Sequence, residues 1–141
     1  MVTYENGVLK VTLDKETLTK LHGDDGFFGM FAGSELLMMK PGEKIVFEQT
    51  DNLKNEFEVE LKHDADRVFQ HMVRETPPDK RVYTFTAQNV PGEHAAQFRV
   101  QRNHGQIWDF VVVVADKTPD WYEELKNLHS NPDEDPRLVS E

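Results

Sequence analysis

The sequence predicts a mostly β protein, an antiparallel β-sandwich of the immunoglobulin-like or jelly-roll-like kind. Two observations predict it: short segments of alternating apolar and polar residues recur along the chain, and pairs of turn-forming residues separate them. We expect two helices, one short and directly after an N-terminal hairpin, the other near the C-terminus. With 141 residues, the chain is long enough for one domain with its own core.

The first elements follow from local signals. Asn6-Gly7 is a preferred pair for a two-residue turn, so VTYENGVLKVTL predicts a β-hairpin. The next segment, DKETLTKLHG, predicts a short helix, which Asp14 can cap at its N-terminus and Gly23 can end.

The middle of the chain predicts a run of strands. They are SELLMMK, KIVFEQ, NEFEVELK, RVFQHMV, RVYTFTA and HAAQFRVQ, with turns such as Pro41-Gly42 and Pro91-Gly92 among them. In NEFEVELK the apolar residues face the core, and Glu56, Glu58 and Glu60 face water. These like charges discourage pairing between sheet edges, and they can also meet a basic partner. In RVFQHMV, His71 alternates with Phe69 and Val73, so all three are expected to point inward.

The last predicted strand, QIWDFVVVVA, is apolar on both faces apart from Asp109, so its second face needs a cover. A C-terminal helix over residues 119–129 is one candidate, with Thr118 as its cap and Pro119 as its first residue. The other candidate is a second copy of the chain. Residues 1–129 are expected to form one domain, followed by a disordered acidic tail at 130–141.

A glycine-rich stretch, HGDDGFFGMFAG, is the main candidate binding site. Its apolar residues Phe27, Phe28, Met30 and Phe31 either close one end of the sandwich or anchor a partner protein. Glycines at this density favour a loop over a helix, because each costs about 1 kcal/mol relative to alanine in a helix. We predict these four residues as the binding residues.

Carboxylates in two loops suggest a calcium site. Asp24, Asp25, Asp64 and Asp66 are the candidate ligands, since calcium takes six or more oxygen ligands. Acids are also common in turns for local hydrogen-bonding reasons, and neither loop follows the EF-hand pattern. Apart from calcium, no cofactor is expected. A small enzyme using His63, His94 and His104 is a further alternative.

The amino-acid composition limits the classes of partner that the chain is expected to bind. The chain has no cysteine and a formal net charge of -10, which argues against disulfides, nucleic-acid binding and charge-driven docking on anionic membranes. There is no apolar run of membrane-spanning length and no secretion signal, so a cytoplasmic location is expected. The predicted function is non-catalytic binding to another protein, or to a second copy of the chain in a homo-oligomer.

The segments KPGEKIVF and DFVVVV resemble the chagasin-type inhibitors of cysteine proteases, which are immunoglobulin-like proteins with a similar turn and a late valine-rich strand. The resemblance implies protease inhibition as an alternative function. The family's inhibitory loops are missing here: there is no Asn-Pro-Thr-Thr-Gly, Gly-x-Gly-Gly or Arg-Pro-Trp, and RNHGQIW lacks the proline of the last. No residue role is carried over from that family.

Overall fold

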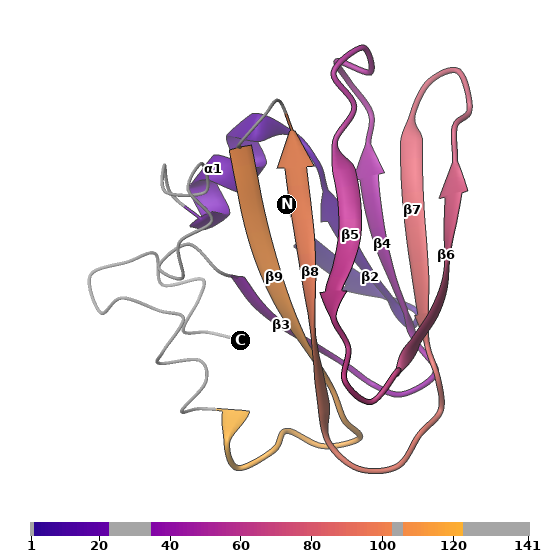
Figure 1. Cartoon of the computed structure of the whole chain (residues 1–141), viewed down its shortest axis with the longest axis vertical. Coiled ribbons are helices and arrows are strands. Elements are labelled where there is room, and N and C mark those ends of the chain that lie inside the picture. The colour runs from indigo at the N-terminus through magenta and orange to yellow at the C-terminus, as the bar shows by residue number, and fades with distance from the viewer. Residues whose placement is uncertain (1, 23–34, 103–105, 123–141) are drawn as a thin grey trace.

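The computed structural model of the chain describes residues 2–22, 35–102 and 106–122, and it is mostly β (Figure 1). Its strands are β1 Val2–Glu5, β2 Val8–Thr12, β3 Glu35–Met39, β4 Lys44–Gln49, β5 Glu58–His63, β6 Phe69–Glu75, β7 Arg81–Ala87, β8 His94–Arg102 and β9 Gln106–Val114. One helix, α1 Lys15–His22, is found in the described part, and no helix there is long and apolar enough to cross a membrane.

The strands form two mixed sheets. One has the order β1-β2-β4-β7-β6, and the other has the order β3-β9-β8-β5. The expectation of purely antiparallel sheets is wrong, because β2 pairs with β4 in parallel and β3 pairs with β9 in parallel. Between β2 and β4 the chain passes through α1 and joins the other sheet as β3. A connection of this length allows the next strand of the sheet to pair in either direction, whereas a two-residue hairpin allows antiparallel pairing alone.

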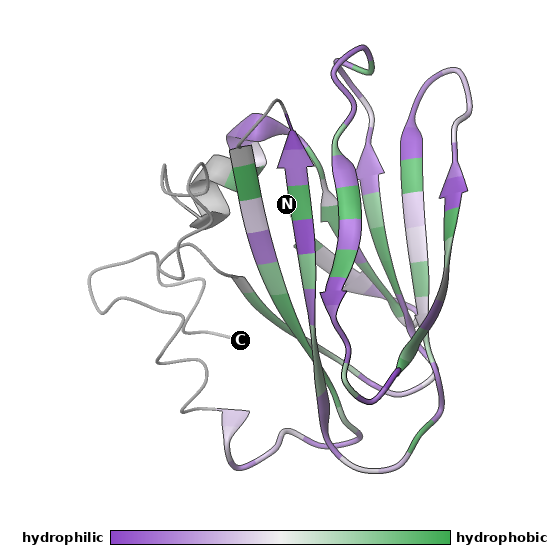
Figure 2. Cartoon of the chain, viewed as in Figure 1, coloured by the Kyte–Doolittle hydropathy of each residue, from purple (hydrophilic) through white to green (hydrophobic). Residues whose placement is uncertain are grey.

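The two sheets face each other across one aromatic core. The ring of Phe47 on β4 lies 5.5 Å from that of Phe98 on β8 and 5.7 Å from that of Phe110 on β9. Phe85 on β7 approaches Phe98 to 4.8 Å, so both sheets contribute to the same cluster. Figure 2 shows the matching alternation of hydrophobic and hydrophilic residues along β5 and β8. The chain is therefore sandwich-like, with inward apolar faces that the alternation predicted.

The expected N-terminal hairpin and short helix are both present. Asn6 and Gly7 have φ values of 52° and 77°, the left-handed conformation that the two-residue turn requires. The side chain of Asp14 accepts a hydrogen bond of 2.7 Å from the Thr17 amide, so it caps α1 as expected. Gly23, the expected end of the helix, lies outside the described residues.

The C-terminal segment covers the second face of β9. Trp121 and Tyr122 pack with Val111 and Val113, and Tyr122 is 3% exposed. Pro119 accepts a hydrogen bond of 3.0 Å from the Tyr122 amide, which forms a turn. Residues 123–129 of the expected helix and the tail at 130–141 lie outside the described residues.

β6 departs from the simple alternation. Its pairing with β7 runs from Gln70 opposite Thr86 to Val73 opposite Thr84, so β6 carries one extra residue in a bulge. The extra residue reverses the facing of the side chains that follow. Val73 is therefore 53% exposed, and the expectation that it shares the inward face of Phe69 is wrong. The side chain of His71 lies outside the described part.

Candidate binding site at the open side of the sandwich

β5 and β6 are edge strands that lie on the same side of the molecule, one in each sheet (Figure 1). Among the described strands, β5 pairs with β8 alone and β6 pairs with β7 alone. Two adjoining cavities of about 380 and 270 Å³ lie along this side, and Val59 and Glu60 line both. We call β5, β6 and these two cavities the open side.

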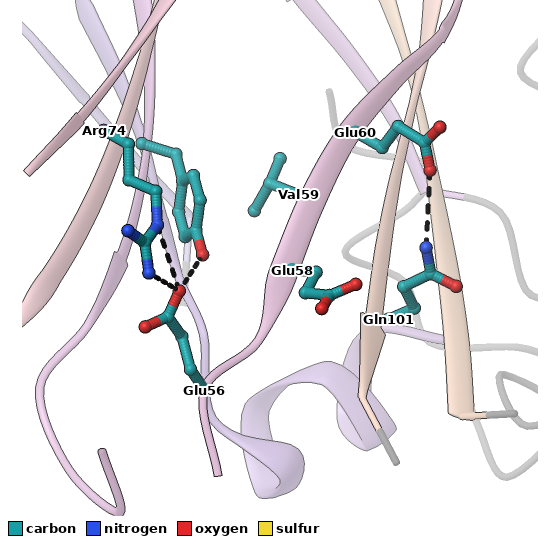
Figure 3. A pocket seen from close by; sticks show the side chains of 7 residues that line it. Glu56, Glu58, Val59, Glu60, Arg74 and Gln101 are labelled. Carbon is teal, nitrogen blue, oxygen red and sulfur yellow. Dashed lines mark hydrogen bonds and ion pairs between the residues drawn. The ribbon is translucent and has the colours of Figure 1, made fainter. Parts of the chain in front are cut away.

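Glu56 lines the first cavity and makes hydrogen bonds with residues of the opposite sheet. This residue lies two positions before β5 begins. Its carboxylate accepts a hydrogen bond of 3.1 Å from Nε of Arg74 on β6 (Figure 3), and another of 3.1 Å from Nε of Arg81 on β7. The Tyr83 hydroxyl reaches the same carboxylate and also lies 2.7 Å from the Phe57 carbonyl. This cluster joins the start of β5 to the opposite sheet.

The contacts within this cluster shift the pKa values of Glu56 and Tyr83. Partial burial acts to raise the pKa of Glu56, but the hydrogen bonds from Arg74 and Tyr83 and the charge of Arg74 outweigh it, so this pKa is lowered. Burial, followed by the hydrogen bond to Glu56, raises the pKa of Tyr83 to about 12. At neutral pH the cluster is therefore a carboxylate held by guanidinium groups and a neutral phenol.

The side chains of β5 alternate between the two sides of the strand. Val59 points toward the side of Glu56 and Arg74, and it is 7% exposed (Figure 3). Glu58 and Glu60 are exposed, and Gln101 on β8 donates a hydrogen bond of 3.3 Å to Glu60. The edge of β5 thus offers an apolar inner side and an acidic outer side.

The second cavity is mainly apolar. Its lining includes Leu61 from β5, Phe69 and Met72 from β6, and Phe85 from β7. Met72 is 44% exposed and lies at the rim of this cavity. The cavity can accept an apolar side chain from a partner.

Two polar side chains fix the segments that lead into β5 and β6. Gln49 is fully buried, accepts a hydrogen bond of 3.1 Å from the Phe57 amide, and holds the loop before it. Asp64 accepts hydrogen bonds of 2.9 and 2.8 Å from the amides of Val68 and Phe69. The open side is therefore built on rigid supports.

Of the residues predicted from the sequence as binding and metal sites, the structure describes two, Asp64 and Asp66. The other six are outside the described residues: Asp24, Asp25, Phe27, Phe28, Met30 and Phe31. Asp64 holds backbone amides as described above, and Asp66 lies 2.7 Å from Nδ1 of His94. Within the described ranges, no three His, Cys, Asp or Glu side chains gather as metal ligands would. The calcium site remains a prediction.

Two of the three histidines expected to share one end do so. His63 ends β5 and His94 begins β8, and because these strands are antiparallel both lie at the same end of the sandwich. Nε2 of His94 lies 2.8 Å from the Pro91 carbonyl. His104 lies outside the described residues. The hydrogen bond to Asp66, followed by that to Pro91, raises the pKa of His94.

The local sequence does not indicate the partners of Glu56 or the role of Gln49. Alternation predicts one acidic face of Glu56, Glu58 and Glu60, but the carboxylate of Glu56 turns toward β6 and β7. Arg74 and Arg81 are 18 and 25 residues away in sequence, and nothing local links them to Glu56. The one available signal was the placement of two arginines on either side of the Pro77-Pro78 turn.

No protein-family model matches the chain, and no curated protein matches it in sequence. Among solved structures, the cysteine protease inhibitor EhICP2 from Entamoeba histolytica is 10% identical, with 76% of this chain and 94% of that chain covered and a TM-score of 0.42. A structure of PbICP-C in complex with falcipain-2 is 8% identical, with 75% and 97% covered and a TM-score of 0.41. An inclusion body protein from Burkholderia cenocepacia is 17% identical, with 55% and 58% covered and a TM-score of 0.34. We therefore infer function from the contacts of this chain alone.

Proposed function

We propose that this chain is a non-catalytic protein-binding module whose contact surface is the open side. One observation carries the proposal: two adjoining cavities lie along two strands, each of which is paired on one side only within the part of the chain that the structure describes. An edge strand presents backbone donors and acceptors to which another chain can bind. Met72 adds an exposed apolar contact at the rim of the second cavity.

The rigidity of the site supports this function. Glu56 ties β5 to β6 and β7, and Gln49 and Asp64 fix the adjoining loops. A surface that is already ordered loses little conformational entropy when a partner binds. The open side therefore suits recognition without rearrangement.

The proposal extends to parts of the chain outside the described residues. Phe27, Phe28, Met30 and Phe31 would form a second contact. The 1–129 segment would be a single β-sandwich domain that includes a helix at 119–129, followed by a disordered acidic tail at 130–141. A Phe27→Ser/Phe28→Ser variant tests the second contact. If the stretch is an interface, the variant stays folded and loses binding or self-association in light scattering. If it is core, the variant unfolds.

A displayed library of random short peptides, selected on the full-length chain, tests the contact surface. We expect selected peptides to bind the chain and to be recovered uncleaved, as judged by mass spectrometry. Met72→Glu should abolish their binding, because it puts a charge beside the second cavity. Val73→Glu is the matched control, since Val73 is exposed on the same strand but lines neither cavity.

The proposal fails if no peptide is selected, or if the selected peptides bind both variants as well as the wild type. Cleavage of bound peptides would replace the non-catalytic function with a hydrolytic one.

A further inference from the structure

We propose that the partner is an extended protein segment with alternating basic and apolar side chains, which adds as a strand along the free edge of β5. This inference rests on the proposed function and names the chemistry of the partner. It follows from the pattern of β5, the charge of the first cavity and the apolar lining of the second.

β5 presents a regular edge of alternating chemistry. From Glu58 to Leu61 its residues pair in unbroken register with β8, and the pairing becomes irregular only between Leu61 and His63. Outward Glu58 and Glu60 alternate with inward Val59 and Leu61. Directly opposed side chains on neighbouring strands lie on the same face of a sheet. An added strand would therefore place one set of side chains beside the glutamates and the other set beside Val59 and Leu61.

The outer positions favour cations. Three glutamates and one arginine line the first cavity, so its net formal charge is -2. Glu56 already binds the guanidinium groups of Arg74 and Arg81. The remaining exposed carboxylates are those of Glu58 and Glu60, of which Glu60 also has Lys62 Nζ at 3.7 Å. Opposite charges directly across two strands stabilise the pairing, so lysine or arginine fits these positions.

The inner positions favour apolar side chains. The second cavity, of about 270 Å³, lies between Leu61 on β5 and Met72 on β6, with Phe69 and Phe85 also in its lining. A leucine-sized side chain that enters it would be removed from water on several sides. Burying such a side chain contributes about 1.5–3 kcal/mol when complete.

The same pattern argues against a second copy of β5 as the occupant. An antiparallel pair of β5 strands centred on Val59 would set Glu58 of each copy opposite Glu60 of the other. A pair centred on Glu60 would oppose the two Glu60 carboxylates while it set Glu58 opposite Lys62. Like charges opposite one another destabilise a strand pair. The acidic edge therefore disfavours self-pairing and favours a basic strand.

The test measures binding of the full-length chain to an acetylated and amidated peptide, Thr-Lys-Leu-Lys-Leu-Lys-Thr, by calorimetry. Three controls separate the requirements. In the first control Glu replaces each Lys, and in the second Ser replaces each Leu. The third control, Thr-Lys-Lys-Leu-Leu-Lys-Thr, keeps the composition of the test peptide but breaks its alternation. We expect the alternating peptide to bind at least about tenfold more tightly than each control, and less tightly at high salt.

Variants of the chain locate the peptide. Glu58→Gln/Glu60→Gln removes both outward charges at exposed positions and should weaken binding about fivefold to tenfold. Glu5→Gln/Asp116→Asn removes the same charge at exposed positions elsewhere and should change it less than about twofold. Met72→Gln should weaken binding, and Val73→Gln should not. Thermal melting checks that all four variants are folded.

The inference is overturned if the third control peptide binds as well as the alternating one, or if Glu58→Gln/Glu60→Gln binds like the wild type. It is also overturned if only the acidic control binds. These results leave the proposed function standing when library-selected peptides still depend on Met72. The proposed function itself fails when Met72→Glu has no effect on any bound peptide.

Discussion

The side-chain oxygen of buried Gln49 accepts a hydrogen bond of 3.1 Å from the backbone amide of Phe57. The Nε2 atom of Gln49 points to the loop between them, and it lies 3.0 to 3.2 Å from the carbonyls of Asp51, Asn52 and Asn55. One amide group from the end of β4 therefore shapes the whole loop that leads into β5. Since Glu56 lies in this segment, the same contact positions the first cavity.

Gln49→Leu is expected to destabilise the chain by at least about 2 kcal/mol, because each buried polar group left unsatisfied costs about 1–3 kcal/mol. Leucine removes the acceptor for the Phe57 amide and the donor for the loop carbonyls. Urea denaturation measures the change, with Gln70→Leu as the control at an exposed position on β6. A Gln49→Leu variant as stable as this control would contradict the role assigned to Gln49.

Glu56→Gln should lose stability at neutral pH and approach the wild type in acid. The folded pKa of Glu56 lies below its ordinary value of 4.5, so its ionised form stabilises the folded state. That contribution is fully present above pH 4.5 and is lost as the pH falls through the lowered value. Unfolding free energies of the wild type and the variant across this range test the prediction. Glu58→Gln, at an exposed position, is the control. A gap between Glu56→Gln and the wild type that is constant with pH would contradict it.

The ion pair of His94 and Asp66 should make stability fall as the pH rises above 6.5 and through the raised pKa of His94. The hydrogen bond to Asp66, followed by that to the Pro91 carbonyl, raises the pKa of His94 above 6.5. Its contribution is therefore fully present below pH 6.5 and is lost as the pH rises through the raised value. Asp66→Asn should bring the pKa of His94 down in an NMR titration, whereas Asp116→Asn should leave it unchanged. Identical titration of His94 in Asp66→Asn and the wild type would refute this linkage.

The strands and their faces could be predicted from the sequence because alternation and turn residues are local signals. Asn6-Gly7 and the apolar residues of β4 are examples. The parallel pairing of β2 with β4 could not be predicted, since alternation indicates a face and not a neighbour. The exposure of Val73 follows from a bulge whose position depends on the pairing with β7.

The candidate site was predicted less well for a related reason. The sequence predicts an acidic row of Glu56, Glu58 and Glu60 that can meet a basic partner. Glu56 has a role different from that of the other two because it binds Arg74 and Arg81. Those contacts join two sheets and arise only when the chain folds. The cavities likewise depend on how the edges of two sheets meet.

Hydrogen–deuterium exchange of the full-length chain, with and without a library-selected peptide, tests the central claim most directly. If partners bind at the open side, the peptide should slow amide exchange in β5 and β6, and Met72→Glu should remove this protection. Protection confined to the opposite edges, at β1 and β3, with none in β5 or β6, would contradict the account.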